Sequence, residues 1–324
     1  MGLQMKMWLL VVLMFAILYG VITAIGSFMG VGSATSYIVL AVLFMGFQYL
    51  IGPSMVSLMM RVTWVSEKEE PELHRQVAEL AQRAGIPKPK VGVSQLSIAN
   101  AFAFGRTLKD GRVCITRGIQ RLLTKDELKA VIGHEISHLK HRDMMIITLL
   151  SVIPLILYWI AFSLMWGGMS GGRRQEGSYA ALIGAGAFVL YFLTNLLVMY
   201  GSRIREYYAD EGSVKLGNPS QHLASALYKL VYSSAQLKRN PRAQEELKRV
   251  EGVKAFFLND VSRALNEVRE LQQVDRDLSG TIDQNELLTL RSQEVKLGKA
   301  EKMMEIFTTH PNMLKRIKRL ATLA

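Results

Sequence analysis

The distribution of charge constrains the fold of this chain more than any other feature, because three long stretches contain no Asp, Glu, Lys or Arg. The first lies between Lys6 and Arg61, and the others are Met144–Gly172 and Gly177–Ser202. A helix in a soluble core needs only one apolar stripe and keeps polar residues on its other face. Stretches without any charge therefore indicate helices whose solvent is lipid.

The first uncharged stretch is divided by Gly26–Ser36, so we expect four membrane-spanning helices, each near the roughly 20 residues that cross a bilayer. They are Trp8–Met29 and Tyr37–Met60 in a hairpin of residues 1–60, and Met145–Trp166 and Tyr179–Tyr200 in a hairpin of residues 144–201. As an alternative, Met1–Met29 is a cleaved signal peptide. Its apolar run is longer than the ~7–15 residues of a typical signal core, and a second span follows at once.

Lys and Arg near the span ends predict the orientation. If the spans alternate, one side receives Lys6, Arg61, Lys68, Lys140, Arg142, Arg203 and Arg205, and only Arg173 and Arg174 fall on the other. We therefore expect a multi-pass protein of the cell membrane whose two termini and two polar regions, 61–143 and 202–324, are cytoplasmic.

The net charge of +12 suits polar regions that lie against anionic lipid. No basic cluster is interleaved with aromatic residues, so we expect no nucleic-acid partner. Cys114 is the only cysteine, which excludes an intrachain disulfide and suits a reducing compartment.

The polar regions predict an α+β fold that is mainly α. In the first region an amphipathic helix, Glu69–Ala84, precedes short strands at Lys90–Ser97 and Arg112–Thr116 and an apolar segment, Asn100–Phe104, that fits an edge strand. Thr124 and Glu127 then form a capping box for a helix that we expect to run on towards the third span. The second region reads as mostly helical.

The sequence His134-Glu135-Ile136-Ser137-His138 carries the chemistry. Residues four apart share one face of a helix, so both imidazoles can bind one zinc ion, and Glu135 can act as general base on a water molecule. The alternative is a plain pair of surface histidines, but the capped helix supplies the context that the motif needs. We therefore expect a zinc-dependent hydrolase with its motif helix beside a small sheet.

A catalytic zinc site needs a third protein ligand and leaves one position open for water. Glu206 is the best candidate, because two spans separate it from His138 and so return the chain to the same side of the membrane. Asp210 lies four residues later on the same helical face, where it can orient a ligand imidazole. The alternative reading is that both are solvated charges beside the end of a span.

Taken together, these patterns resemble the HtpX-type membrane metalloproteases, relatives of the CAAX prenyl proteases in the zincin group. The resemblance extends from the first span to nearly the last residue. It is carried by Gly85–Pro89, Asn100–Ala103, Val131–His138, Arg205–Asp210 and Thr309–Pro311. It implies a membrane-bound endopeptidase that clears misfolded membrane proteins at a site facing the cytoplasm.

Residue by residue, the resemblance implies zinc ligands at His134, His138 and Glu206, with Glu135 as the base. It also implies a substrate-aligning edge at Asn100, Ala101, Phe102 and Ala103. His310 would be a polar group near the developing oxyanion. A cap or packing role for His310 is the competing interpretation.

Residues 275–286 fit the twelve-residue loop of an EF-hand, which the resemblance does not predict. The ligand positions are Asp275, Asp277, Ser279, Thr281, Asp283 and Glu286. The sequence therefore suggests a structural or regulatory Ca²⁺ site, with an acidic helix–helix turn as the alternative.

Two other functions stay open from the sequence. One is a non-catalytic membrane scaffold or calcium-responsive adaptor, whose zinc site would be closed by a fourth ligand such as His141. The other is a prenyl-protein (CAAX) protease. The intact Glu135 favours an enzyme over a scaffold, because a structural zinc site has no use for a base.

Overall fold

The computed structural model describes Leu13, Ile17 and residues 34–170, 174–237, 244–245, 257–259, 263–277, 279–293 and 298–324. The chain forms two compact units. The first comprises Met1–Ile51 and Met145–Ser202, and the second comprises Gly52–Met144 and Arg203–Ala324. Apart from Leu13 and Ile17, the expected first span at Trp8–Met29 lies outside the described residues.

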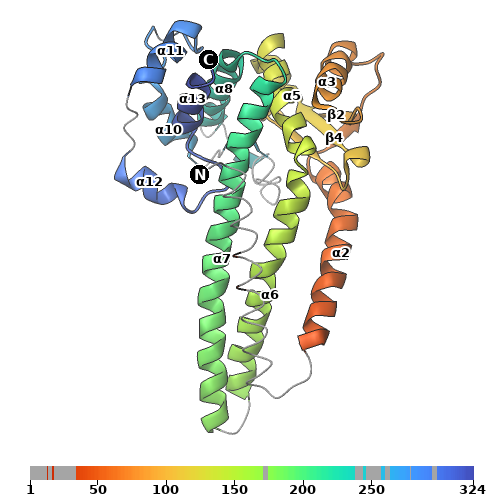
Figure 1. Cartoon of the computed structure of the whole chain (residues 1–324), viewed down its shortest axis with the longest axis vertical. Coiled ribbons are helices and arrows are strands. Elements are labelled where there is room, and N and C mark those ends of the chain that lie inside the picture. The colour runs from red at the N-terminus through yellow and green to blue at the C-terminus, as the bar shows by residue number, and fades with distance from the viewer. Residues whose placement is uncertain are drawn as a thin grey trace. The chain divides into compact units, whose positions relative to one another are not determined.

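The elements follow one another in chain order and are labelled in Figure 1. They are α2 (Ala34–Met59), β1 (Val62–Trp64), α3 (Pro71–Ala84), β2 (Lys90–Ser94), β3 (Ala101–Phe104), η1 (Leu108–Asp110), β4 (Arg112–Thr116), α4 (Arg117–Leu122), α5 (Lys125–Lys140), α6 (Asp143–Ser170), α7 (Arg174–Lys215), α8 (Ser220–Leu237), α10 (Ala264–Leu271), α11 (Gln284–Ser292), α12 (Lys299–Glu305) and α13 (Met313–Ala321).

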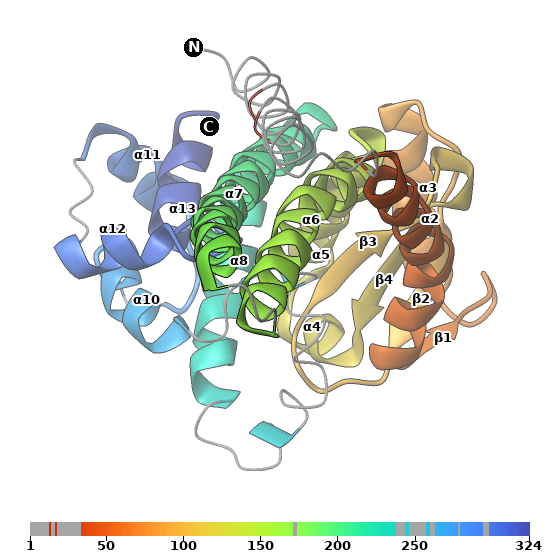
Figure 2. The same cartoon turned by 90° about the horizontal axis from the view of Figure 1, so that it is seen from below.

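In the first unit, α6 and α7 lie side by side along their length (Figures 1 and 2). Gly184 of α7 marks a close approach, because a Cβ there would collide with Met165 and the carbonyl of Ala161 on α6. Many large apolar side chains of both helices remain exposed, among them Trp159 and Leu182. Small residues between the helices and bulky apolar ones outside are the pattern of helices surrounded by lipid.

Only one helical segment within the described ranges, Tyr179–Lys215, is both long and apolar enough to cross a membrane. Tyr49–Met59 and Leu150–Met165 are apolar but shorter. The expectation of four spans is therefore not confirmed, although α2, α6 and α7 are helical where spans were predicted.

The second unit contains a four-stranded mixed sheet in the order β1-β2-β4-β3, which Figure 2 shows beside α3, α4 and α5. Strands β2 and β4 are parallel, whereas β1 and β3 pair antiparallel with β2 and β4. The α+β class is thus confirmed, and β3 is an edge strand as expected. The short strand β1 was not foreseen.

Both faces of β3 are buried because its side chains alternate between two cores. Ala101 and Ala103 join the core that contains α3, α5 and α8, while Phe102 and Phe104 join a second cluster with Met60. The small side chains on the first face leave room for α5, which packs against this strand.

The helix that carries the histidine motif does not run on into α6, so that expectation was wrong. Helix α5 ends at Lys140, Arg142 adopts a left-handed φ of 55°, and α6 begins at Asp143. A non-glycine residue with positive φ reverses the local backbone and separates the two helices.

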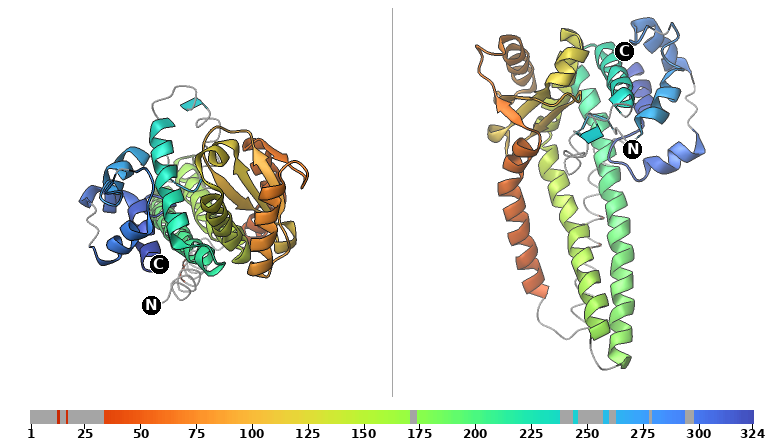
Figure 3. Two further views of the ribbon diagram at one scale, coloured as in Figure 1. Left: turned by 90° about the horizontal axis from the view of Figure 1, so that it is seen from above. Right: turned by 180° about the vertical axis from the view of Figure 1, so that it is seen from behind.

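The C-terminal helices of the second unit form a helical group, coloured teal and blue in Figure 3. Helices α10 and α13 pack on α8, and α11 packs on α13. Leu223, Leu227 and Leu230 of α8 are fully buried in this group. This packing brings α13, near the end of the chain, into the same unit as α5.

Candidate metal centre

The motif helix α5 begins at the capping box seen in the sequence. The Thr124 side chain accepts the N–H of Glu127, and the Glu127 carboxylate accepts the N–H of Thr124. From this start the helix enters the core, so that His134 is fully buried and His138 is partly buried. The two imidazoles lie one turn apart on the same face.

Small residues allow α5 to approach the C-terminal part of α7 very closely. A Cβ at Gly133 would overlap the side chains of Ser213 and Asn218, and one at Gly212 would overlap Ser137. Ser213 Oγ also donates a hydrogen bond of 2.6 Å to the carbonyl of Ala130. This contact sets the histidines of α5 against the acidic residues of α7.

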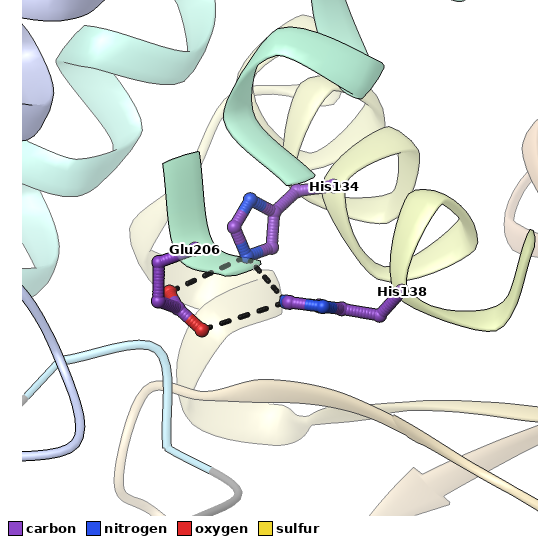
Figure 4. A group of neighbouring side chains, drawn as sticks. All are labelled: His134, His138 and Glu206. Carbon is purple, nitrogen blue, oxygen red and sulfur yellow. Dashed lines mark hydrogen bonds and ion pairs between the residues drawn. The ribbon is translucent and has the colours of Figure 1, made fainter. Parts of the chain in front are cut away.

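Three side chains converge where the two helices meet (Figure 4). His134 Nε2 and His138 Nε2 lie 3.0 Å apart. The carboxylate of Glu206 reaches both, with Oε2 at 3.7 Å from His134 Nε2 and Oε1 at 3.5 Å from His138 Nε2. The sequence had named these three residues as one group, and the structure brings them together.

This arrangement fits a zinc ion. Donor atoms around a tetrahedral zinc with bonds of ~2.0–2.1 Å lie roughly 3.3 Å apart, close to the distances found here. Each histidine Nδ1 faces a carboxylate, which can only accept a proton, so each Nε2 is left as an acceptor. Two acceptors 3.0 Å apart repel each other unless a cation lies between them.

Asp210 lies beside the first histidine. Its Oδ1 lies 2.9 Å from His134 Nδ1. Arg316 of α13 donates Nε and Nη2 to the two oxygens of Asp210 at 2.9 and 2.7 Å, and its Nη1 lies 3.0 Å from Glu206 Oε2. Arg316 is wholly buried, and besides fixing these carboxylates its Nη1 donates a hydrogen bond of 2.9 Å to the carbonyl of Leu258.

A second carboxylate holds the other histidine in the same way, and the sequence reasoning missed it. Asp143 Oδ2 lies 2.5 Å from His138 Nδ1 and 2.7 Å from Arg205 Nη2. Asp143 and Arg205 are both buried. Each imidazole therefore faces one carboxylate, and each carboxylate is fixed by one arginine.

Burial and charge set the protonation of the centre. Burial lowers the pKa of His138 to about 4, against the opposing charge of Glu206, so this imidazole is neutral near pH 7. Burial would raise the pKa of Glu206, but the charges of Arg316 and His310 outweigh it and hold this pKa well below 4.5. A neutral imidazole and an ionised carboxylate are the forms that bind zinc.

Glu135 lies beside the metal candidates but outside their group. It is buried, and this burial raises the pKa of its carboxyl to about 7, with the neighbouring His134 acting in the opposite direction. The N–H of Ala103 donates a hydrogen bond to this carboxylate. A carboxyl with a pKa near 7 can both accept and release a proton at neutral pH.

The other residues named from the sequence lie around this centre in different ways. His310 is buried, its Nδ1 lies 3.5 Å from Glu206 Oε2, and its Nε2 makes no hydrogen bond within the described part of the chain. Asn100 Oδ1 accepts the N–H of Leu258, so this side chain ties two segments together. Ala101, Phe102 and Ala103 form the edge strand itself.

His141 is not a fourth member of the group. Its Nδ1 lies 2.8 Å from the carbonyl of Ser137 and 3.3 Å from the Ser137 hydroxyl. A closed zinc site with four protein ligands, as a scaffold would require, therefore gains no support from this residue.

In the described residues of the EF-hand-like loop, the carboxylates accept hydrogen bonds from backbone N–H groups of the same loop. Asp275 accepts the Tyr228 hydroxyl at 2.5 Å and the N–H of Ser279 and Gly280, while Glu286 forms a capping box with Asp283 at the start of α11. Asp275, Asp277 and Glu286 come close enough to share an ion. Calcium binding at this loop stays a prediction.

Comparison with known proteins agrees with the geometry of the centre. The sequence model of peptidase family M48 matches residues 67–324. A protease HtpX homolog from Methanothermobacter thermautotrophicus is 50% identical over 229 residues, covering 71% of this chain and 86% of the relative. A protease HtpX homolog from Thermoplasma acidophilum is 30% identical and covers 99% of this chain and 97% of its own length.

Among solved structures, the crystal structure of S. mikatae Ste24p shares the fold. The TM-score is 0.50 at 18% sequence identity, and the match covers 98% of this chain and 67% of that one. The match to the family extends over most of the chain and includes every residue of the centre described above. This chain therefore belongs to peptidase family M48, as a metalloprotease of the HtpX type.

Proposed function

We propose that this protein is a zinc-dependent endopeptidase of the cell membrane that hydrolyses misfolded or membrane proteins on the cytoplasmic side, as part of protein quality control. The observation that carries the proposal is the convergence of His134, His138 and Glu206 beside the buried Glu135. Three protein ligands and an adjacent base form a hydrolytic zinc site, not a closed structural one.

In this proposal His134, His138 and Glu206 hold the ion, and Asp210 and Asp143 orient the two imidazoles. A bound zinc ion supplies Lewis acidity, which polarises the scissile carbonyl and lowers the pKa of a water molecule. Glu135 accepts the proton of the attacking water and delivers it to the leaving amine. His310 Nε2 is free to donate to the oxyanion that forms on the carbonyl.

The edge of β3 serves as the substrate guide in this mechanism. The strand lies at the end of the sheet, and the N–H of Ala103 already points to Glu135. An extended substrate that adds to this edge is held by backbone hydrogen bonds and brings a peptide bond next to the base. Recognition through backbone atoms suits a protease that acts on many unfolded sequences.

The test is degradation of casein by detergent-purified protein, with Glu135→Gln run beside wild type and the bound zinc counted in both. We expect about one zinc in each protein and a loss of cleavage in the variant of at least ~100-fold, the usual contribution of a general base. Zinc in both proteins with cleavage in neither would favour the scaffold. Cleavage of a prenylated peptide but not of casein would favour the CAAX protease.

A further inference from the structure

Helix α12 and the two residues after it carry an exposed apolar surface, which we call the α12 patch. It consists of Met303, Met304, Ile306 and Phe307, whose exposed fractions lie between 44% and 65%. The spacing i, i+1, i+3 and i+4 places these side chains on one side of a helix. Four bulky apolar side chains together at the surface mark an interaction site more often than a chance exposure.

The charges of α12 are distributed so that the apolar patch has a basic flank. Glu301 turns away to Arg263 and Asn266, at 2.7 and 2.9 Å, and Glu305 is buried against Lys315. Lys302, next to the patch, is exposed. A helix with an exposed apolar side and an exposed lysine has the character of a helix that lies in the headgroup region of a membrane.

The position of the patch along the fold points to the same environment. Arg203 Nη1 donates hydrogen bonds to the carbonyls of Ile306 and Thr308, at 3.1 and 2.6 Å. Arg203 is the first charged residue after the uncharged stretch Gly177–Ser202, within the segment long and apolar enough to cross a membrane. Arginine at the end of such a segment lies at the level of the lipid headgroups.

We propose that the α12 patch inserts shallowly into an anionic lipid leaflet, the one at which the apolar segment of α7 ends. Lipid is the occupant that these observations favour, because the backbone of the patch is hydrogen-bonded to the residue that leaves the membrane, and its exposed flank is basic. The inference rests on the membrane embedding in the proposed function and adds a second attachment to it.

This attachment has a consequence for the centre. His310 follows Phe307 after two residues, and Arg316 lies on the next helix. A patch held at the lipid surface would hold the segment that carries His310 and Arg316 there too. A substrate chain that leaves the bilayer would then reach the centre with only a short unfolded segment between the lipid surface and the centre.

The test uses the full-length, zinc-loaded protein in lipid nanodiscs, with bimane attached at Met303→Cys. Cys114 is fully buried, so it contributes little labelling. Leu288→Cys on α11, where the native side chain is 43% exposed, is the matched control. We expect lipids brominated near the headgroup to quench bimane at position 303 at least ~2-fold more than at position 288, and more in phosphatidylglycerol than in phosphatidylcholine discs.

The other outcomes separate the possible errors. A label at 303 that is no more quenched than at 288 overturns the proposal. A blue-shifted label that brominated lipid does not quench also overturns it, since a second copy or another segment then covers the patch. Equal quenching in both lipids, unchanged by Lys302→Glu, overturns the anionic part. Protein that does not enter nanodiscs contradicts the membrane embedding itself, whereas protein that enters but stays unquenched contradicts only the patch.

Discussion

At the scale of single residues, the centre is built from two equivalent arms. His134 leads to Asp210 and Arg316, and His138 leads to Asp143 and Arg205. In each arm the carboxylate fixes the tautomer and orientation of the imidazole, and the arginine keeps the carboxylate ionised in a buried place. An unpaired carboxylate buried there would cost several kcal/mol, so each arginine is part of the arm.

The arm formed by Asp143 and Arg205, which the sequence did not reveal, leads to a prediction about zinc binding. Asp143→Asn should weaken zinc binding by ~10–100-fold, because an amide cannot hold the His138 proton as a carboxylate does. Competition with a fluorescent zinc chelator measures this affinity without reference to activity. Asp110→Asn is the control, since Asp110 pairs with Arg106 and Arg112 away from the centre. Equal zinc affinity in Asp143→Asn and wild type would refute the role of this arm.

The sequence alone predicted those residues of the centre that belong to local patterns. His134, Glu135 and His138 form a motif within five positions, and Glu206 follows from counting spans. Arg316 could not be found in this way, because it lies 106 residues from Asp210 and their pairing depends on how α13 packs. Asp143 was hidden for another reason: it was expected inside a continuous helix, where its side chain would not return to His138.

At the scale of elements, local sequence patterns likewise could not predict the boundary between α5 and α6. The capping box at Thr124 and Glu127 is a local pattern, so the start of α5 was predicted correctly. The end of α5 has no glycine or proline, and the left-handed Arg142 is imposed by its surroundings instead of its own preference. Helix starts are therefore better encoded in this chain than this helix end.

Glu127, the acidic member of the capping box of α5, also predicts a dependence of stability on pH. Burial alone would raise the pKa of Glu127, but hydrogen bonds from Lys229, Ser225 and Thr124 lower it below 4.5. A lowered pKa in the folded state means that the carboxylate stabilises the fold above pH 4.5 and loses this effect as the pH falls. Glu127→Gln should therefore cost about 1–3 kcal/mol at pH 7, and progressively less as the pH falls below 4.5 and through the lowered pKa of the folded state.

Unfolding in detergent by denaturant, at pH 7 and at a series of lower pH values that passes well below 4.5, measures this difference. Glu72→Gln is the matched control, because Glu72 lies on the exposed side of α3 and pairs with the exposed Arg75. That change should alter the free energy of unfolding by less than ~0.5 kcal/mol. A penalty for Glu127→Gln that stays as large at the lowest pH of the series as at pH 7 would show that its charge is not the cause.

The loop at 275–286 is the element whose function can be decided most simply. Calcium would have to replace the hydrogen bonds that Asp275 and Glu286 accept within the chain, so we expect weak binding, with a Kd of about a millimolar. Isothermal titration of wild type with calcium should show it, and Glu286→Gln should remove it. Wild type that does not bind calcium at millimolar concentration would leave an acidic turn that only connects α10 and α11.

At the scale of the whole molecule, the charge pattern predicts which side of the membrane the polar regions face, whereas the local structure does not. The helices α2, α6 and α7 coincide with predicted spans, but a helix of suitable composition does not reveal which side of a membrane its ends face. The bias of Lys and Arg predicts this side, because basic residues near span ends favour the cytoplasmic side. The prediction from this bias is that the protease centre and its arms lie on that side as well.

Labelling with a membrane-impermeant maleimide tests this orientation in intact spheroplasts. The exposed Ser66→Cys lies in the first polar region, and Ser178→Cys lies between the predicted third and fourth spans. We expect Ser178→Cys to be labelled at once and Ser66→Cys only after the cells are permeabilised, because two short hairpins with basic inner ends place them on opposite sides. The reverse pattern would put the centre outside the cell, and labelling of both without permeabilisation would remove the paired-hairpin topology altogether. Wild type reports the background, which buried Cys114 should keep low.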